Sequence, residues 1–393
     1  MSSRPSAARR RTIRRRRAVA LAVPITAAIA VAIITGLQGA GSRADTPRGA
    51  RLGGRSAPVG GTPNAHRHQA STGAGNLRPG SNPSVLPGPV LIADRDNNRL
   101  LEVSPEGRVL WRFPAPGDLA RGQTFLLPDD AFFSPDGREI VVTQEDDFAI
   151  SVVNLASDRI VYRYGHPGIP GSEPGYVHNP DDAMLMPSGE LLSADIKNCR
   201  VLVIRPPTHQ PLRQLGETGV CEHDLGVSYG SPNGAFPMAN GDTAITEING
   251  DWLDVIAPNG TPVLDTHPPG FTYPSDTNQV GPGLFLSVDY TDPGAIETFT
   301  STGELRWRYE PTGAAALDQP SLALPLPNGD ILANDDKNDR VIVVDPHTNK
   351  IVWQYGHTHV PGSGEGFLSN PDGVDLAPPY SLDERFAGTL QAP

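Results

Sequence analysis

The residues whose chemistry stands out in this sequence are histidines and aspartates that recur in matching loops. Two segments, 164–181 and 355–372, are near copies, and each runs from Tyr-Gly-His to Asn-Pro-Asp. A third loop contains Glu222, His223 and Asp224 in succession. Imidazoles and carboxylates that converge on one cavity suit zinc, calcium or another divalent ion. The same groups also suit general acid–base catalysis.

These loops define a candidate site for a ligand or a metal. Its members are His166, His178, His223, His357, Asp181, Asp182 and Asp372. Two simpler interpretations stay open. The histidines can recur only because a repeat copies its loop residues, and the aspartates can serve as turn caps that accept a backbone N–H. No two histidines have the H-x-x-x-H spacing of a helical metal site. The sequence therefore leaves the cofactor unknown, with zinc or calcium as candidates, and leaves open whether the protein is an enzyme.

Short strands in a repeated unit must position these side chains. In the unit at 179–204, three predicted strands are separated by a turn at 187–189 and a loop at 195–200. The same unit recurs in four further places, and in all five copies a glycine follows the proline by nine positions. The prolines of these five copies are Pro128, Pro180, Pro232, Pro274 and Pro320. Short strands between such turn residues predict antiparallel meanders.

A sixth copy is divided between the two ends of the repeated region. It begins at Asn370-Pro371-Asp372, and its other strands match residues 90–113. Successive prolines of the six copies lie 42 to 52 residues apart, a period typical of propeller blades. A ring of sheets closes without a long open edge when the two termini share one blade. The sequence therefore predicts an all-β, six-bladed β-propeller over 82–378, closed by a C-terminal inner strand.

Loops and outer strands of this chain resemble those of known propeller families. The motif D-x-x-N-x-R occurs at 94–99, 195–200 and 335–340 and resembles the loop of NHL repeats. Fourth strands that carry a tryptophan, such as the one in 343–353, resemble quinoprotein-type repeats. The resemblance implies a propeller fold, which supports enzymes, binding modules and scaffolds alike. Six blades rather than eight argue against a quinone cofactor.

The first function that we expect is that of a binding module. It would hold a small molecule, a glycan or a protein segment on the face that carries the histidine and aspartate loops. The alternative is a metal-assisted enzyme that uses the same side chains. Propeller lyases of the peptide-amidating type and arylsulfotransferases are the analogies for that alternative, and a hydrolase fits it equally.

The first 81 residues predict a membrane tether. Residues 1–17 form a basic segment with eight arginines, and residues 18–37 contain no charge over a length that crosses a bilayer as a helix. Arginines before this transmembrane anchor would stay in the cytoplasm, so we expect a single-pass protein of the cell membrane with its propeller on the extracytoplasmic side. A cleaved secretory signal ending near Ala44 is the alternative. Residues 38–81 predict a flexible linker, and residues 379–393 predict a polar tail.

Charge divides the chain and limits its partners. Residues 1–80 hold fourteen arginines and one acid, whereas the remaining residues hold 18 basic and 43 acidic side chains. Because such an acidic body repels nucleic acid, we exclude nucleic acid as a partner. The expected partners are a small molecule, a glycan or a protein, together with the membrane through the N-terminal helix.

The chain has two cysteines, Cys199 and Cys221, which the repeat pattern places on the same face of the propeller. Export favours a disulfide between them, because disulfides form and persist in oxidising compartments. Two free thiols are the alternative.

Overall fold

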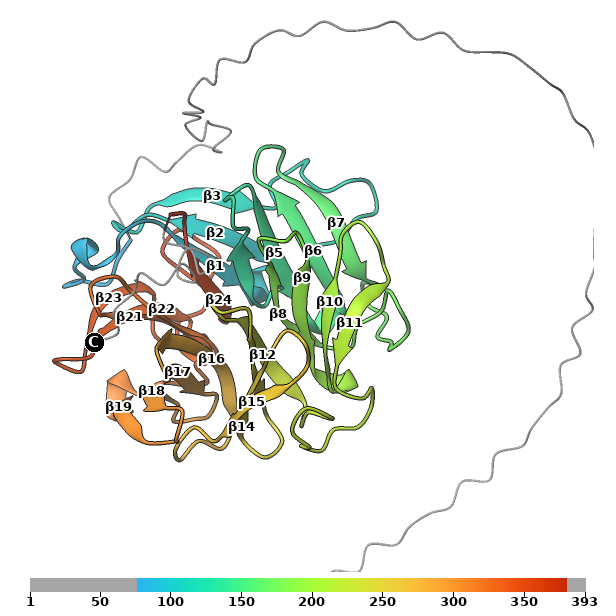
Figure 1. Ribbon diagram of the computed structural model, residues 1–393. Helices are drawn as coiled ribbons and strands as arrows, with labels where there is room; N and C mark the ends of the chain where they lie inside the picture. Colours follow the sequence, from blue (N-terminus) through green and yellow to red (C-terminus); the bar gives the residue numbers. More distant parts are fainter. Residues whose placement is uncertain (1–75, 380–393) are drawn as a thin grey trace, which may run out of the picture. The chain divides into compact units, whose positions relative to one another are not determined.

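The computed structural model describes residues 76–379, which form a β-propeller of six four-stranded sheets (Figure 1). The predicted all-β, six-bladed fold is confirmed. The expected transmembrane anchor at 18–37 lies outside the described residues, as do the basic segment and most of the expected linker and tail. Within 76–379, no helix is both long enough and apolar enough to cross a membrane.

Each blade is an antiparallel meander, and we number the blades 1 to 6 in the order of the following lists. The innermost strands are β24 (Pro371–Leu376), β4 (Ala131–Phe133), β8 (Pro180–Leu185), β12 (Pro232–Pro237), β16 (Pro274–Gly281) and β20 (Ala323–Pro325). The second strands are β1 (Val90–Asp94), β5 (Glu139–Gln144), β9 (Leu191–Asp195), β13 (Thr243–Glu247), β17 (Leu284–Asp289) and β21 (Ile331–Asp335). The third strands are β2 (Arg99–Val103), β6 (Ala149–Asn154), β10 (Arg200–Ile204), β14 (Trp252–Ile256), β18 (Ala295–Thr300) and β22 (Arg340–Asp345). The outer strands are β3 (Val109–Phe113), β7 (Arg159–Gly165), β11 (Pro211–Leu215), β15 (Pro262–Thr266), β19 (Leu305–Tyr309) and β23 (Lys350–Gly356).

Burial follows the position of each strand in its blade. Every residue of β1, β9 and β21 is buried, because a blade is covered on both faces by its neighbours. The outer strand β11 instead alternates half-buried and exposed residues over most of its length. Valine, isoleucine and leucine therefore fill the middle strands, and their side chains form the apolar core between blades.

Blade 1 joins the two ends of the propeller, as the divided repeat predicts. Strand β24 pairs with β1 in antiparallel register, with Ile92 opposite Val374 and Val90 opposite Leu376. All four side chains are fully buried. The inner edge of β1 is thus hydrogen-bonded, and the predicted closure by a C-terminal inner strand is confirmed.

Tryptophans of the outer strands connect neighbouring blades. Trp111, Trp307 and Trp353 each donate their Nε1–H to the turn between the third and outer strands of the next blade. The acceptors are Asp158 Oδ1, Asn349 Oδ1 and the carbonyl oxygen of Pro105, at 2.9, 2.8 and 2.8 Å. Trp111 and Trp353 are buried, and a buried indole usually finds such an acceptor, so these contacts support a packing role for the tryptophan-bearing strands.

The D-x-x-N-x-R loops hold the connections between blades. In blade 3, the Nε–H of Arg200 donates to Asp195 Oδ2 at 2.8 Å, and its other nitrogens donate to the carbonyl oxygens of Ser172 and Tyr176 in the loop that leads into the blade. Asn198 donates to the same aspartate and to another carbonyl oxygen of that loop. Blades 1 and 6 contain the same buried Arg–Asp pair. The motif therefore fixes loop positions through a buried ion pair whose hydrogen bonds are satisfied.

Cys199 and Cys221 form a disulfide. Cys199 follows the short 3-10 turn Ile196–Asn198 of blade 3, and Cys221 lies in the loop between β11 and β12. The disulfide therefore ties the loop that enters blade 4 to the preceding blade.

The N-terminal end of the described chain lies on blades 1 and 6. The backbone N–H of Asn76 donates to the carbonyl oxygen of Gly107, and that of Arg78 donates to the carbonyl oxygen of Gln354. Leu77 forms a β-bridge with Tyr355. Residues 76–81, which the sequence assigns to the linker, thus contact the propeller.

Candidate functional site

The entry into each inner strand is built in nearly the same way. In five blades, the residue before the repeat proline has a positive φ of 49–59°. These residues are Leu127, Asn179, Ser231, Gln319 and Asn370. A residue in the left-handed backbone conformation, followed by a proline, bends the chain at the start of the strand. The side chain after the proline is thereby presented at the same level in every blade.

The side chains at this position form a ring around a central cavity. They are Asp129, Asp181, Asn233, Ser275, Ser321 and Asp372, one from each blade. The cavity has a volume of about 300 Å³. Loops between the second and third strands extend its wall, because Arg95, Glu145 and Lys337 also line it. The cavity therefore lies on the face that carries the loops between second and third strands, where the sequence predicts ligand binding.

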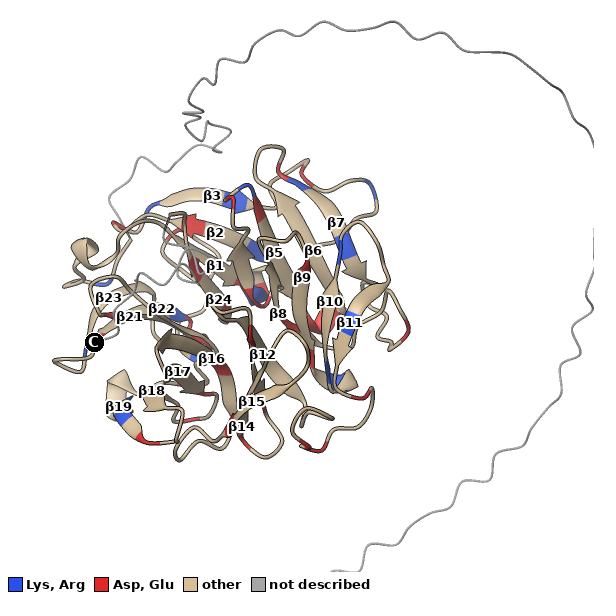
Figure 2. Ribbon diagram, viewed as in Figure 1, with Lys and Arg blue, Asp and Glu red and all other residues tan. Residues whose placement is uncertain are grey.

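Six carboxyl groups face two basic side chains, Arg95 and Lys337, in this cavity. The acids are Asp129, Asp130, Glu145, Asp146, Asp181 and Asp372. Figure 2 shows acidic segments around the middle of the ring, where the inner strands meet. A recessed site with such an excess of negative charge concentrates cations.

Arg95 is the basic side chain of this site that pairs with its carboxylates. Its guanidinium forms ion pairs with Asp129, with Asp146 Oδ2 at 2.6 Å, with Asp372 Oδ2 at 3.0 Å and with Glu145 Oε2 at 3.1 Å. Only 7% of the residue is exposed. Charge-assisted hydrogen bonds of this kind are the strong ones in proteins, so the carboxylates are already arranged around a guanidinium group.

The pKa values of groups in the cavity reflect its excess of negative charge. Burial, together with the charge of Asp181, raises the pKa of Glu145 to about 7. Burial raises the pKa of Asp181 itself to about 6. Burial and the neighbouring carboxylates also raise the pKa of Tyr273 and of Tyr290 above the ordinary value. A second cation in the cavity would therefore stabilise the ionised carboxylates.

Asp130 of the cavity and two further aspartates, Asp182 and Asp276, form a cluster next to the ring. One oxygen of each lies within 4.8 Å of the others, and at most 4% of any of these residues is exposed. In the described part of the chain, Oδ1 of each has no hydrogen-bond partner. Burial and the repulsion between the carboxylates raise the pKa of all three well above the ordinary value. An all-oxygen set of this type suits Ca²⁺ or Mg²⁺, and Asp130 connects it to the cavity.

The structure places the predicted histidines in other surroundings. His166 lies against Tyr176, with ring centroids 4.1 Å apart, and His357 lies against Phe367 at 4.3 Å. Because these two loops are near copies, the matching contacts favour loop architecture over a ligand role. His178 lies edge-on to a phenylalanine ring of blade 2. Among the described residues that line the cavity there is no histidine.

The seven predicted site residues thus fall into separate groups. Asp181 and Asp372 line the central cavity, and Asp182 belongs to the adjacent aspartate cluster. His223 lies beside Glu247 in blade 4, where its Nδ1 is 3.0 Å from Glu247 Oε1. The structure does not bring the described histidines together with these aspartates in one site.

Sequence reasoning missed several residues of the cavity. Arg95, Glu145, Tyr273 and Tyr290 all line it. A usable signal was present for the ring, because the residue after each repeat proline is polar in all six copies. The loop residues had no such signal. Arg95 occupies a variable position of the D-x-x-N-x-R motif, and the other copies of the motif have no arginine there.

Comparisons with known proteins show the class of fold. No family model matches the chain, and no curated protein sequence matches it. A protein of unknown function from Bacteroides caccae has a similar structure, with a TM-score of 0.52 and 14% identity over 73% of this chain and 98% of that one. A structure of a nidogen–laminin complex gives a TM-score of 0.51 and 16% identity over 74% of this chain and 98% of that one. A streptogramin B lyase structure reaches a TM-score of 0.43, with 16% identity over 60% of this chain and 70% of that one.

These likenesses and the six sheets define a six-bladed β-propeller protein. The identities of 14% and 16% support the fold alone, and the lyase comparison carries no argument about activity.

Proposed function

We propose that this protein is a binding module whose central cavity takes up a cationic group. The group is an ammonium or guanidinium carried by a small molecule or by a protein segment. The arrangement around Arg95 carries the proposal, because four carboxylates already surround a guanidinium there. A cavity with six carboxyl groups favours such a ligand over a neutral glycan.

Two tyrosines supply an aromatic surface beside the acids. The rings of Tyr273 and Tyr290 line the cavity with their centroids 5.4 Å apart. Aromatic faces attract cations through the quadrupole of the ring, most strongly where water is excluded. A volume of about 300 Å³ is at the lower end of small-molecule sites, so the cavity fits a compact cationic head group.

The propeller is proposed to work outside the cytoplasm, tethered to the cell membrane by residues 18–37. The charge-free run after eight arginines supports this arrangement. The disulfide between Cys199 and Cys221 agrees with it, since structural disulfides are typical of oxidising compartments. The acidic mouth of the cavity would then meet ligands from the exterior.

The test is a calorimetric titration with agmatine, which carries a guanidinium at one end and an ammonium at the other. We expect binding that weakens at least tenfold in Asp181→Asn, because this change removes a carboxylate that lines the cavity. Arg95→Gln should strengthen binding, because it frees carboxylates that the chain's own guanidinium now occupies.

Glu304→Gln is the matched control. Glu304 is an exposed acid just before β19 that pairs with Arg306, so its replacement should leave binding unchanged. No binding by the wild type, or equal losses in Asp181→Asn and Glu304→Gln, would contradict the proposal.

A further inference from the structure

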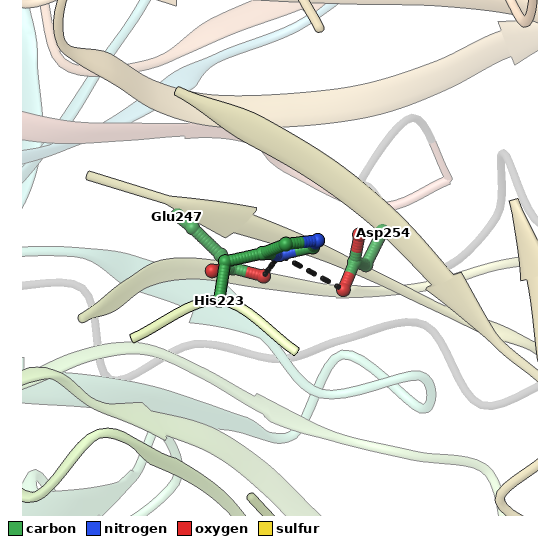
Figure 3. Close-up of side chains that lie close together, drawn as sticks. All are labelled: His223, Glu247 and Asp254. Carbon is green, nitrogen blue, oxygen red and sulfur yellow. Dashed lines mark hydrogen bonds and ion pairs between the residues drawn. The ribbon is translucent and has the colours of Figure 1, made fainter. Parts of the chain in front are cut away.

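A second group of buried acids lies in blade 4. Glu247 ends β13 at the position that the motif aspartate occupies in blades 1, 3 and 6. In those blades, the residue five positions later is the arginine that pairs with the aspartate, whereas blade 4 has Trp252 there. His223, from the loop that enters the blade, lies beside the acid instead (Figure 3).

Two more carboxylates complete this group. Asp254 of β14 lies directly opposite Asp265 of β15 in the strand register. Asp254 Oδ2 lies 3.9 Å from Nδ1 of His223, and Asp265 Oδ2 lies 3.9 Å from its Nε2. Like charges directly opposite each other destabilise a pair of strands, so a cation between these two aspartates would stabilise the pairing of β14 with β15.

Blade 5 also has an acid at this position of its third strand, and it supplies that compensation from its outer strand. In blade 5, the equivalent pair is Glu297 and Arg308, with Arg308 Nη1 3.0 Å from Glu297 Oε2. In blade 2, Ser151 faces Arg163. The outer-strand residues at this register position in blades 1, 2, 3, 5 and 6 are Arg112, Arg163, Gln214, Arg308 and Gln354. Across the six described blades, only blade 4 has an acid there.

Asp254 is the most exceptional member of the group. It is fully buried, and within residues 76–379 neither of its carboxyl oxygens has a hydrogen-bond partner. Glu247 is also fully buried, and its Oε2 accepts the backbone N–H of Gly230. Carboxylates buried in this way require a proton or a cation between them.

We propose that His223, Glu247 and Asp254 bind a zinc ion. One imidazole and two carboxylates form a zinc ligand set that leaves a fourth position for water or another ligand. Bonds of about 2.0–2.2 Å in a tetrahedral site place neighbouring ligand atoms about 3.3 Å apart. The separations from Nδ1 of His223, 3.0 Å to Glu247 and 3.9 Å to Asp254, lie on either side of that value.

The surroundings of His223 suit a metal ligand. Asp265 lies on the Nε2 side, as the carboxylate partner of a metal-bound histidine commonly does. Trp252 stacks on the imidazole with centroids 4.1 Å apart and an interplanar angle of 12°. The disulfide at Cys221, two residues before His223, holds the loop. The His223 side chain is 15% exposed, so the ion can enter from solvent.

The test uses the full-length protein, freed of metal by a chelator and titrated with Zn²⁺ alone. We expect one zinc per chain and a change in tryptophan fluorescence, because Trp252 touches the ligand imidazole. His223→Gln and Asp254→Asn should each lower zinc affinity at least tenfold. Asp254→Asn removes a proposed ligand carboxylate with little change in side-chain volume, so it carries the test even if His223→Gln fails to fold.

Two variants serve as controls. His267→Gln alters a ring that contacts the same tryptophan but bonds a backbone carbonyl, and Asp276→Asn alters the aspartate cluster next to the central cavity. Both should keep wild-type zinc affinity. The proposal is overturned if the wild type binds no zinc, if His223→Gln and Asp254→Asn retain it, or if either control loses it to the same degree.

Discussion

Arg95 and Arg99 lie four residues apart in one loop and have different tasks. Arg99 follows the repeated motif, because it pairs with Asp94 and donates to carbonyl oxygens of the loop that enters blade 1. Arg95 has no counterpart among the repeats, since Ile196 and Asp336 stand at its position in the other two motif loops. In this segment, the residue that recurs among the repeats thus holds the blade, and the residue that breaks the repeat enters the cavity.

The structural task of the motif arginine can be tested in blade 3. Arg200→Met should lower the free energy of unfolding by about 3–5 kcal/mol, because it leaves Asp195 buried without its charge partner. Arg138→Met is the control, since its pair with Asp136 is exposed and should change stability by less than about 0.5 kcal/mol. Equal effects of the two changes in chemical denaturation would show that the buried pair has no special role.

At the scale of elements, the strand entries and the loops contribute differently to the site. Inner strands repeat one entry geometry, which builds the ring of polar side chains around the cavity. Loops between second and third strands vary from blade to blade, and they supply Arg95, Glu145 and Lys337. The repeated elements therefore make the cavity and supply most of its acids, and the variable loops add two acidic and two basic side chains.

Strand β24 is the element on which closure depends. Truncation after Leu368 removes this strand and exposes the inner edge of β1, so we expect the cooperative thermal transition to disappear. Truncation after Pro379 removes no strand of the described propeller and serves as the control. A truncated protein that melts like the control would contradict the role of β24 in closure.

For the whole molecule, buried carboxyl groups with raised pKa values link stability to pH. Burial is the largest cause of each shift, and the values reach about 6 for Asp181, about 7 for Glu145 and about 8 for Glu297. An acid whose pKa is raised in the folded state holds a proton that the unfolded chain has released. The resulting stability is complete below about pH 4 and is lost as the pH rises through 6 to 8.

We therefore expect the free energy of unfolding to fall between pH 5 and pH 8.5. A single group whose pKa is raised by one unit contributes about 1.4 kcal/mol to this change, and several groups are involved. Glu297→Gln should reduce the slope, because it removes one of these titrating groups. Denaturant unfolding measured across this range provides the check, and stability that rises with pH would contradict the assignment of raised pKa values.

Spacing in the sequence was sufficient to predict the propeller but only part of its site. The Pro-to-Gly interval and the divided repeat specify blades and closure, because strand length and turn chemistry are local properties. The same repetition drew attention to His166 and His357, which instead lie against aromatic rings ten residues further along. Arg95 and Tyr290 come to line the same cavity only when the six blades close into a ring, so no local sequence pattern indicates that they belong to the site.

The central claim is that the ring of polar side chains encloses a cation site. A crystal structure of the protein grown with agmatine tests it most directly. We predict an ordered ammonium or guanidinium group in the cavity, within hydrogen-bond distance of Asp181 and against the rings of Tyr273 and Tyr290. A cavity that contains only water at saturating agmatine, or agmatine bound at another face, would contradict the claim.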